Sequence, residues 1–318
     1  MSTLQPTEST EALPSVTTRY PQRNLAACML PWTENYRLDV PAFEEHIQQA
    51  IDGGYQSMYL MGTAGEGYAL TDTRFREVVE IFAAKTVRDG LDPQIGVIAL
   101  SMEQIIERIG FAYDRGIRMF QISLPAWGAL DEAEILVFFQ TVCGNFPDCR
   151  FLHYNLPRTK RVITGAEYRP IVDRVPNLVA TKNSTTDYAR TADLMTHVPE
   201  LQHFFLEGSF AMGCTLGECS LLCSYSVLFP QTSWNFFEAG KRKDLAELFR
   251  ITKIFRDVDQ KLFVHCHRSM IDGSYDKTFI WLHNSKFSNR MLPPYIGLSE
   301  EESHFCRQVY EENYADMI

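Results

Sequence analysis

Residues 179–187 have the sequence VATKNSTTD, which places a single lysine at the end of a short apolar segment. Val179 and Ala180 are typical of a buried strand, and small or polar residues follow Lys182. A buried ammonium group is costly unless it is paired or loses its proton. Lys182 therefore either turns outward into solvent or has an amine that the protein uses.

Seven other short apolar segments precede or follow this one, and amphipathic helical patterns lie between them. The eight segments are LAACML (25–30), SMYLMG (57–62), IGVIAL (95–100), RMFQIS (118–123), RFLHY (150–154), NLVATK (177–182), HFFLEG (203–208) and CSLLCSY (219–225). A helix is expected to begin near Asp39 and end at Gly53. Ser101 and Thr164 each begin a capping-box pattern that predicts a further helix start.

Eight strands alternating with helices predict an α/β fold, a (β/α)8 TIM barrel with a C-terminal helical extension. A doubly wound open sheet is the alternative, but it is expected to carry a glycine-rich phosphate turn after its first strand, and MLPWTENYRLD is not such a turn. We divide the chain into a disordered N-terminal tail (1–23), a catalytic barrel (24–230) and a C-terminal helical region (231–318).

The composition limits the partners and the compartment. The net charge of −10 and the absence of a basic cluster disfavour nucleic acid and anionic membranes as partners. The N-terminus has no basic segment followed by an apolar one, and no apolar run reaches the roughly 20 residues that a transmembrane helix needs. We therefore expect a cytoplasmic protein whose eight cysteines are reduced thiols.

Two groups of potential metal ligands need consideration. They are the His265–His267 segment and the cysteines at 214, 219 and 223. Neither group has a spacing typical of a zinc site, so no metal is expected.

In a parallel barrel the chemistry gathers where the strands end. The residues at the predicted strand ends include Gly62, Thr63, Ser101, Trp127, Tyr154, Lys182 and Gly208. If burial lowers the pKa of Lys182, its neutral amine can attack a ketone and form a Schiff base, with Tyr154 moving the proton. The loop GTAGEG (62–67) offers backbone N–H groups for a substrate carboxylate. Glu66 in this loop is either a base or, more simply, a structural hydrogen-bond acceptor beneath it.

Three motifs in this order resemble those of one enzyme family. GTAGEGYALT (62–71), YNLP (154–157) and TKNSTTD (181–187) are similar to the signatures of the dihydrodipicolinate synthase/N-acetylneuraminate lyase family, and the last helical section, YDKTFIWLHNSKFSNRMLPPYIGLSEEE, resembles the family's C-terminus. The resemblance extends from about residue 24 to the end of the chain.

This resemblance implies a class I aldolase-type lyase without a cofactor, assembled as a homo-oligomer, either a dimer or a tetramer. Lys182 would form a Schiff base with pyruvate or another 2-oxo acid. Tyr154 would act as general acid and base and be linked to Thr63. Gly62, Thr63 and Ala64 would hold the substrate carboxylate, largely through backbone N–H groups.

The chain also departs from the family pattern, at the residue beside the 2-oxo acid carboxylate and at residues expected near the second substrate. Ala64 replaces a common hydroxyl residue, and Trp127 stands where the synthases offer a tyrosine across a dimer contact. Thr159 stands where they carry an arginine for a distal carboxylate. Trp127, Thr159 and Gly208 are nevertheless expected to contact substrate.

These departures argue against true dihydrodipicolinate synthase activity. The expected reaction is carbon–carbon cleavage or condensation with an aldehyde or sugar-acid co-substrate. A dehydratase that uses the same imine, and a 2-oxo-acid-binding protein without turnover, are the alternatives.

Overall fold

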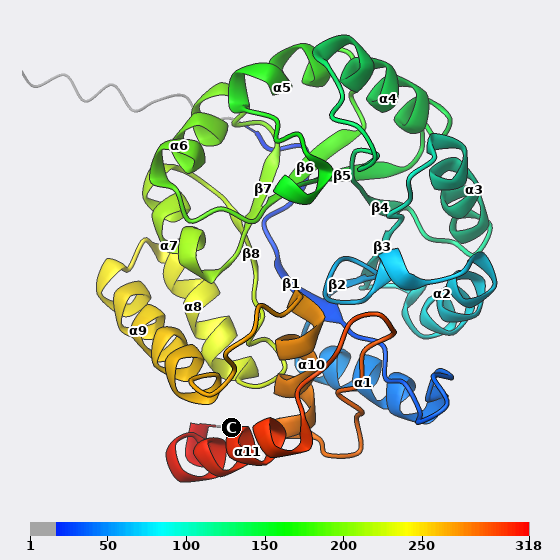
Figure 1. Ribbon diagram of the computed structural model, residues 1–318. Helices are drawn as coiled ribbons and strands as arrows, with labels where there is room; N and C mark the ends of the chain where they lie inside the picture. Colours follow the sequence, from blue (N-terminus) through cyan, green and yellow to red (C-terminus); the bar gives the residue numbers. More distant parts are fainter. Residues whose placement is uncertain (1–16, 318) are drawn as a thin grey trace, which may run out of the picture.

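The computed structural model describes residues 17–317, and its centre is a closed barrel of eight parallel strands in sequence order. The ring of strands is seen end-on in Figure 1. The strands are β1 (Asn24–Cys28), β2 (Ser57–Leu60), β3 (Asp92–Gly96), β4 (Met119–Ile122), β5 (Arg150–Asn155), β6 (Leu178–Asn183), β7 (Gln202–Phe205) and β8 (Ser220–Leu222). The predicted TIM barrel is confirmed, and closure of β8 onto β1 rules out the open sheet.

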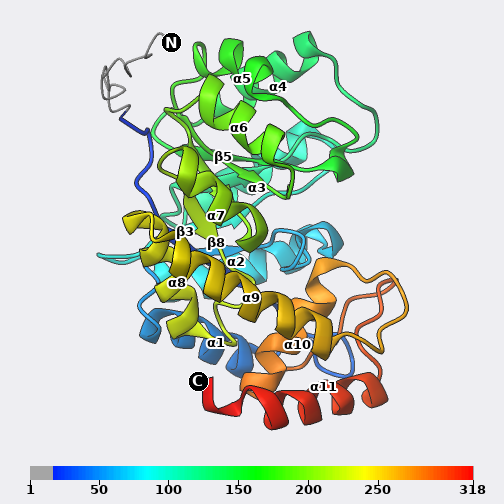
Figure 2. The same ribbon diagram turned by 90° about the vertical axis from the view of Figure 1, so that its left-hand side faces the viewer.

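Eight helices surround the barrel, and three more follow as the predicted extension. They are α1 (Val40–Asp52), α2 (Asp72–Thr86), α3 (Met102–Tyr113), α4 (Glu132–Gly144), α5 (Gly165–Val172), α6 (Tyr188–His197), α7 (Glu207–Leu216), α8 (Pro230–Arg242), α9 (Leu245–Leu262), α10 (Asp272–His283) and α11 (Glu300–Asn313). In Figures 1 and 2, α10 and α11 lie together beside α1.

The helix starts follow the capping chemistry of the sequence. The Asp39 side chain accepts a hydrogen bond from the Ala42 N–H group at the start of α1, and Gly53 ends that helix. Thr164 forms a full capping box with Glu167 at α5. Ser101 caps α3 through the N–H group of Gln104.

Two boundaries differ from the sequence-based division. Residues 17–23 are held against the barrel, since the buried Tyr20 donates a hydrogen bond to Asp92 at the start of β3. Residues 1–16 of the expected tail lie outside the described residues. The last barrel helix, α8, extends beyond residue 230, and its Ser233 accepts a hydrogen bond from Asn24 of β1.

Strand β3 runs from Asp92 to Gly96, so it begins three residues and ends four residues before its apolar segment. The apolar residues that follow it lie beyond the strand end. Gly96 approaches β2 closely, since a Cβ atom there would lie 2.3 Å from the carbonyl oxygen of Met61.

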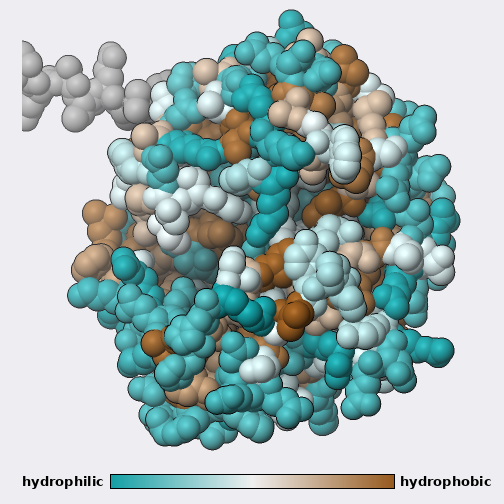
Figure 3. Space-filling model, viewed as in Figure 1, coloured by the Kyte–Doolittle hydropathy of each residue, from teal (hydrophilic) through white to brown (hydrophobic). Residues whose placement is uncertain are grey.

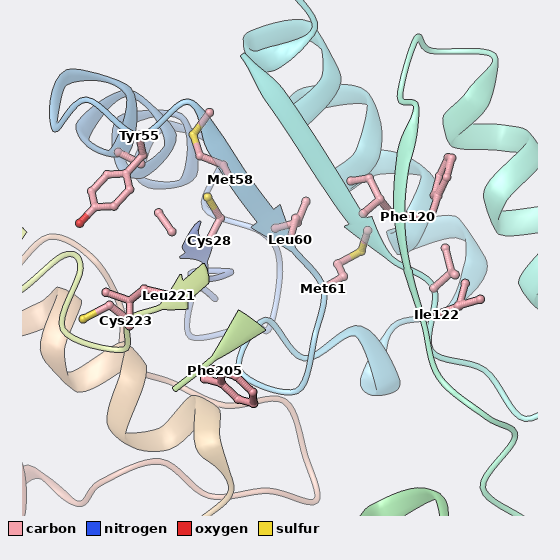
Figure 4. Close-up of a cluster of buried hydrophobic side chains, with 14 of the residues drawn as sticks. Cys28, Tyr55, Met58, Leu60, Met61, Phe120, Ile122, Phe205, Leu221 and Cys223 are labelled. Carbon is pink, nitrogen blue, oxygen red and sulfur yellow. The ribbon is translucent and has the colours of Figure 1, made fainter. Parts of the chain in front are cut away.

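Alternate residues of each strand face two different cores. One set packs outward against the helices, and Figure 4 shows part of it, including Met58 and Leu60 of β2 and Phe120 and Ile122 of β4. The other set fills the barrel interior and includes Tyr59 of β2. The two-residue period of a strand therefore decides which side chains reach the interior.

Most of the surface in the view of Figure 3 is hydrophilic, with hydrophobic residues visible in hollows near its centre. Among residues 17–317, none of the helices combines the length and the apolar character needed to cross a membrane.

Candidate active site

Lys182 and Tyr154 are paired residues on adjacent strands of the barrel. Lys182 of β6 is in register with Tyr154 of β5, and both lie two residues beyond an interior position, Ala180 and Leu152 respectively. Both side chains therefore point into the barrel. The Nζ atom of Lys182 lies 3.9 Å from the centre of the Tyr154 ring. Lys182 is only 6% exposed, so its amine does not turn into bulk solvent.

The Lys182 amine has oxygen neighbours that favour its charged form. It donates a hydrogen bond of 3.2 Å to the hydroxyl group of Tyr59. Burial by itself lowers the pKa of Lys182, but the oxygens of Tyr154 and Tyr59 and the charge of Asp272 outweigh it, so the pKa lies above its ordinary value. The net shift of the Lys182 pKa is therefore upward, opposite to the effect of burial alone. A proton must leave Lys182 before its nitrogen can attack a ketone.

Tyr59 is a site residue that the sequence did not reveal. Its position within an apolar strand is typical of core packing, and burial raises the pKa of its phenol to about 12. The phenol is therefore neutral near neutral pH. A Cβ atom on Gly62 would lie 1.1 Å from the Tyr59 hydroxyl oxygen, so glycine at this position leaves the space that Tyr59 occupies.

The loop after β2 borders two cavities, since Ala64 lines the one that contains Lys182 and Thr63 lines a second, larger one. The hydroxyl groups of Thr63 and Tyr154 are 3.3 Å apart, within hydrogen-bonding distance. Within residues 17–317, the backbone N–H groups of Thr63 and Ala64 donate no hydrogen bond to another protein group. Two adjacent free donors are suited to a carboxylate.

Glu66 anchors this loop rather than facing the interior. It has a left-handed backbone conformation, with φ of 53°. Its carboxylate accepts hydrogen bonds from the Trp32 indole and the Leu292 N–H group, both at 2.7 Å, and forms a fully buried ion pair with Lys277 of α10. Of the two roles considered for Glu66, the contacts fit the structural one.

Helix α10 forms one wall of the cavity that contains Lys182. The cavity has a volume of about 50 Å³, and since a water molecule needs roughly 10–15 Å³ on this measure, it has room for a small molecule. Its polar lining includes Tyr59, Tyr154, Lys182, Ser224, Asp272, Tyr275 and Asp276. The α10 residues have no sequence pattern that marks them as site residues.

Charged groups also lie around this cavity. Arg158 and Asp272 form a bidentate ion pair, with distances of 3.2 and 2.8 Å. Asp276 is buried, and burial together with Asp272 and Glu207 raises its pKa well above the ordinary value. Burial likewise raises the pKa of Glu207 to about 7. The α10 side of the cavity is therefore acidic.

Three residues that the sequence predicts as substrate contacts, Trp127, Thr159 and Gly208, do not line the cavity that contains Lys182. Trp127 is 82% exposed and lines neither the cavity that contains Lys182 nor the second, larger cavity. Thr159 lines a second cavity of about 540 Å³, and its hydroxyl group is committed to the carbonyl groups of Leu156 and Arg161. Gly208 is exposed in the first turn of α7 and does not line the Lys182 cavity.

The part of the chain that the structure describes contains no cluster of three or more His, Cys, Asp or Glu side chains suited to a metal ion. Cys214 and Cys219 do approach each other, with 3.7 Å between their sulfur atoms, but both thiols are buried.

Comparison with protein families and curated proteins shows which family the chain is similar to. The model of the dihydrodipicolinate synthetase family matches residues 20–311. The 4-hydroxy-tetrahydrodipicolinate synthase of Exiguobacterium sibiricum is 28% identical over 175 residues, which is 55% of this chain and 59% of that protein. The N-acetylneuraminate lyase of Homo sapiens is 26% identical over 247 residues, which is 71% of this chain and 74% of that protein.

Solved structures share the fold over nearly the whole chain. A dihydrodipicolinic acid synthase family protein from Escherichia coli, solved in complex with pyruvate, has a TM-score of 0.82 at 18% identity and covers 91% of this chain and 98% of its own. A dihydrodipicolinate synthase family protein from Coccidioides immitis has a TM-score of 0.79 at 18% identity, with coverage of 95% and 99%. At these identities the likeness concerns the fold alone.

Proposed function

We propose, since the chain belongs to the dihydrodipicolinate synthetase family, that it is a class I aldolase-type lyase acting on pyruvate or a related 2-oxo acid. The observation that carries this proposal is the position of Lys182, whose amine is buried inside the barrel, 3.9 Å from the Tyr154 ring and on the wall of a small cavity. A lysine with a purely structural role at a strand end is normally exposed to solvent.

In the proposed reaction, the carboxylate of the 2-oxo acid binds the N–H groups of Thr63 and Ala64, and its keto carbon faces Lys182. Lys182 loses a proton and attacks that carbon, and water leaves to give an iminium ion. The positively charged nitrogen then accepts electrons from the adjacent carbon, which allows a neighbouring carbon–carbon bond to break or form. Tyr154, held by Thr63, moves protons to and from the reacting oxygen.

The co-substrate is proposed to be an aldehyde or sugar acid without a distal carboxylate. Thr159 offers no positive charge, and Arg158 is already paired with Asp272. Both facts disfavour a second carboxylate at this position, which agrees with the doubt about true dihydrodipicolinate synthase activity. We also propose that the protein is a cytoplasmic homo-oligomer, a dimer or tetramer, as the family resemblance implies.

Trapping with borohydride tests the proposal directly. Incubation with pyruvate and borohydride should add a reduced pyruvyl group to Lys182, detected by intact mass and peptide mapping, and Lys182→Met should abolish it. Absence of the adduct would reject every imine mechanism for this protein.

A panel of substrates then separates the possible outcomes for a protein that forms the adduct. Release of pyruvate from a 2-oxo-3-deoxy sugar acid identifies a lyase. Loss of water with all carbon atoms retained identifies a dehydratase. An adduct without turnover of any compound in the panel identifies a binding protein.

A further inference from the structure

Asp276 is a buried carboxyl group in the Lys182 cavity that the proposed mechanism does not use. It is 5% exposed and lines the cavity together with Lys182 and Tyr154. The other carboxyl group on the cavity wall, Asp272, is bound by Arg158. Among residues 17–317, Asp276 has no ion-pair partner within 4 Å.

The surroundings of Asp276 favour its protonated form. The groups that act on its carboxyl are Asp272, Glu207, Lys182 and Ser224. Burial and the two other carboxyl groups raise the pKa of Asp276 by more than Lys182 and Ser224 lower it. A carboxylic acid that is neutral near neutral pH is a proton donor.

Glu207 and Ser224, which follow β7 and β8, act on the carboxyl group of Asp276, whereas its neighbours on α10 contact the carboxylate-binding loop. Gly273 touches that loop in the first turn of α10, where a Cβ atom would lie 2.8 Å from the Ala64 carbonyl oxygen. Asp276 lies one helical turn further along α10. A 2-oxo acid with its carboxylate on Thr63 and Ala64 and its keto carbon at Lys182 must direct its third carbon away from the loop.

The contacts of Tyr154 lie on the loop side of Lys182. Its hydroxyl group is within hydrogen-bonding distance of Thr63, at the loop, and its ring lies beside the Lys182 nitrogen. Breaking the carbon–carbon bond leaves an enamine whose third carbon needs a proton before pyruvate can leave. A second acid on the cavity wall can supply that proton.

We propose that Asp276 is a catalytic residue that donates this proton to the third carbon of the enamine on Lys182. In this step the O–H bond of Asp276 breaks and a C–H bond forms with the electron pair of the C=C bond. The nitrogen lone pair forms the C=N bond of the iminium ion, and the Asp276 carboxylate regains a proton from water. The inference rests on the Schiff-base function proposed above.

Hydrogen exchange of pyruvate tests this step without a co-substrate. Reversal of the step removes a methyl proton from bound pyruvate, so the enzyme in D₂O should replace the methyl hydrogens, which proton NMR follows. Borohydride trapping of the same samples measures imine formation separately. Asp276→Asn is expected to form the adduct at close to the wild-type rate but to exchange the methyl hydrogens at least about 10²-fold more slowly.

The matched control is Asp259→Asn on α9. Asp259 is a carboxyl group whose pKa is also raised by desolvation, but it is bonded to Tyr225 and does not line the cavity. Its variant should keep the wild-type ratio of exchange to trapping. Asp276→Ser provides a second variant without a carboxyl group should the asparagine disturb folding.

The outcomes separate this inference from the proposed function. No adduct in the wild-type protein would reject the function itself. A wild-type adduct with an unchanged ratio of exchange to trapping in either Asp276 variant would overturn the role of Asp276 alone. Loss of trapping in both Asp276 variants would also overturn it, because Asp276 would then serve to build the site.

Discussion

Lys182 on β6 donates a hydrogen bond to Tyr59 on β2 through the barrel interior, with 3.2 Å between its Nζ atom and the hydroxyl oxygen. The two strands are not neighbours in the sheet, so this bond joins separate parts of the barrel. The phenol oxygen accepts from the ammonium form of Lys182 and stabilises it. In the resting protein this hydrogen bond therefore favours the protonated form of Lys182, the nucleophile of the proposed reaction.

Removal of this acceptor should make Lys182 easier to deprotonate. For Tyr59→Phe we expect the pH profile of pyruvate trapping to move about one unit toward lower pH. A hydrogen bond to a charged group contributes roughly 1.5–3 kcal/mol, and one pKa unit corresponds to about 1.4 kcal/mol. Borohydride trapping rates measured between about pH 6 and pH 9 provide the comparison.

Tyr113→Phe is the matched control for Tyr59→Phe, since the Tyr113 hydroxyl group bonds Asp148 at the surface. Its profile should coincide with that of the wild type. If the Tyr59 variant also kept the wild-type profile, Tyr59 would have no influence on the charge of Lys182.

The raised pKa of Lys182 also predicts the pH dependence of the wild-type protein. Only the neutral amine attacks a ketone, and below the pKa its fraction increases about tenfold with each pH unit. The initial rate of imine formation with pyruvate should therefore rise steadily between about pH 6 and pH 9. Stopped-flow mixing followed by rapid borohydride quenching measures it. A rate that stays constant over this range would mean that substrate binding itself removes the proton.

Sequence reasoning located the strand-derived half of this site. Lys182 and Tyr154 could be predicted because a two-residue period and a strand end together place a side chain at the barrel mouth. Thr63 follows a strand in the same way. The exact strand limits could not be predicted, as β3 shows, because a close approach such as that of Gly96 to Met61 depends on the neighbouring strand.

The rest of the site was not visible in the sequence. Tyr59 has the pattern of a core residue, and only the barrel geometry brings its hydroxyl group to Lys182. Asp276 and Lys277 lie about 90 residues after the lysine, on a helix whose packing against the barrel has no local signal. Their roles depend on tertiary contacts that periodicity does not encode.

Tyr154 should affect rate rather than stability. For Tyr154→Phe we expect the rate of imine formation with pyruvate to fall about 10²-fold or more, because a positioned acid–base group supplies that factor. The ring remains in place beside Lys182, so the midpoint of thermal unfolding should change little. Rapid trapping and differential scanning calorimetry measure the two effects.

Thr63→Val is the companion variant to Tyr154→Phe, since it removes only the partner of the phenol. It should reduce the rate by a smaller factor, about tenfold or less, and have little further effect when combined with Tyr154→Phe. A Tyr154 variant with wild-type rates would show that another group moves the proton.

The buried ion pair of Glu66 and Lys277 should control the stability of the carboxylate-binding loop. Removing one partner leaves a buried group without its counter-charge, which costs about 3–5 kcal/mol. Lys277→Met should therefore lower the free energy of unfolding by about that amount.

Lys277→Met combined with Glu66→Gln should be less destabilised than the two single losses added together, because neither charge then remains buried alone. Trp32 and Leu292 bond different oxygen atoms of Glu66, so in Glu66→Gln one of these two donors keeps the amide oxygen and the other loses its acceptor. Urea unfolding of the four proteins in a double-mutant cycle measures the coupling, and additive losses would mean that the pair contributes nothing to holding the loop.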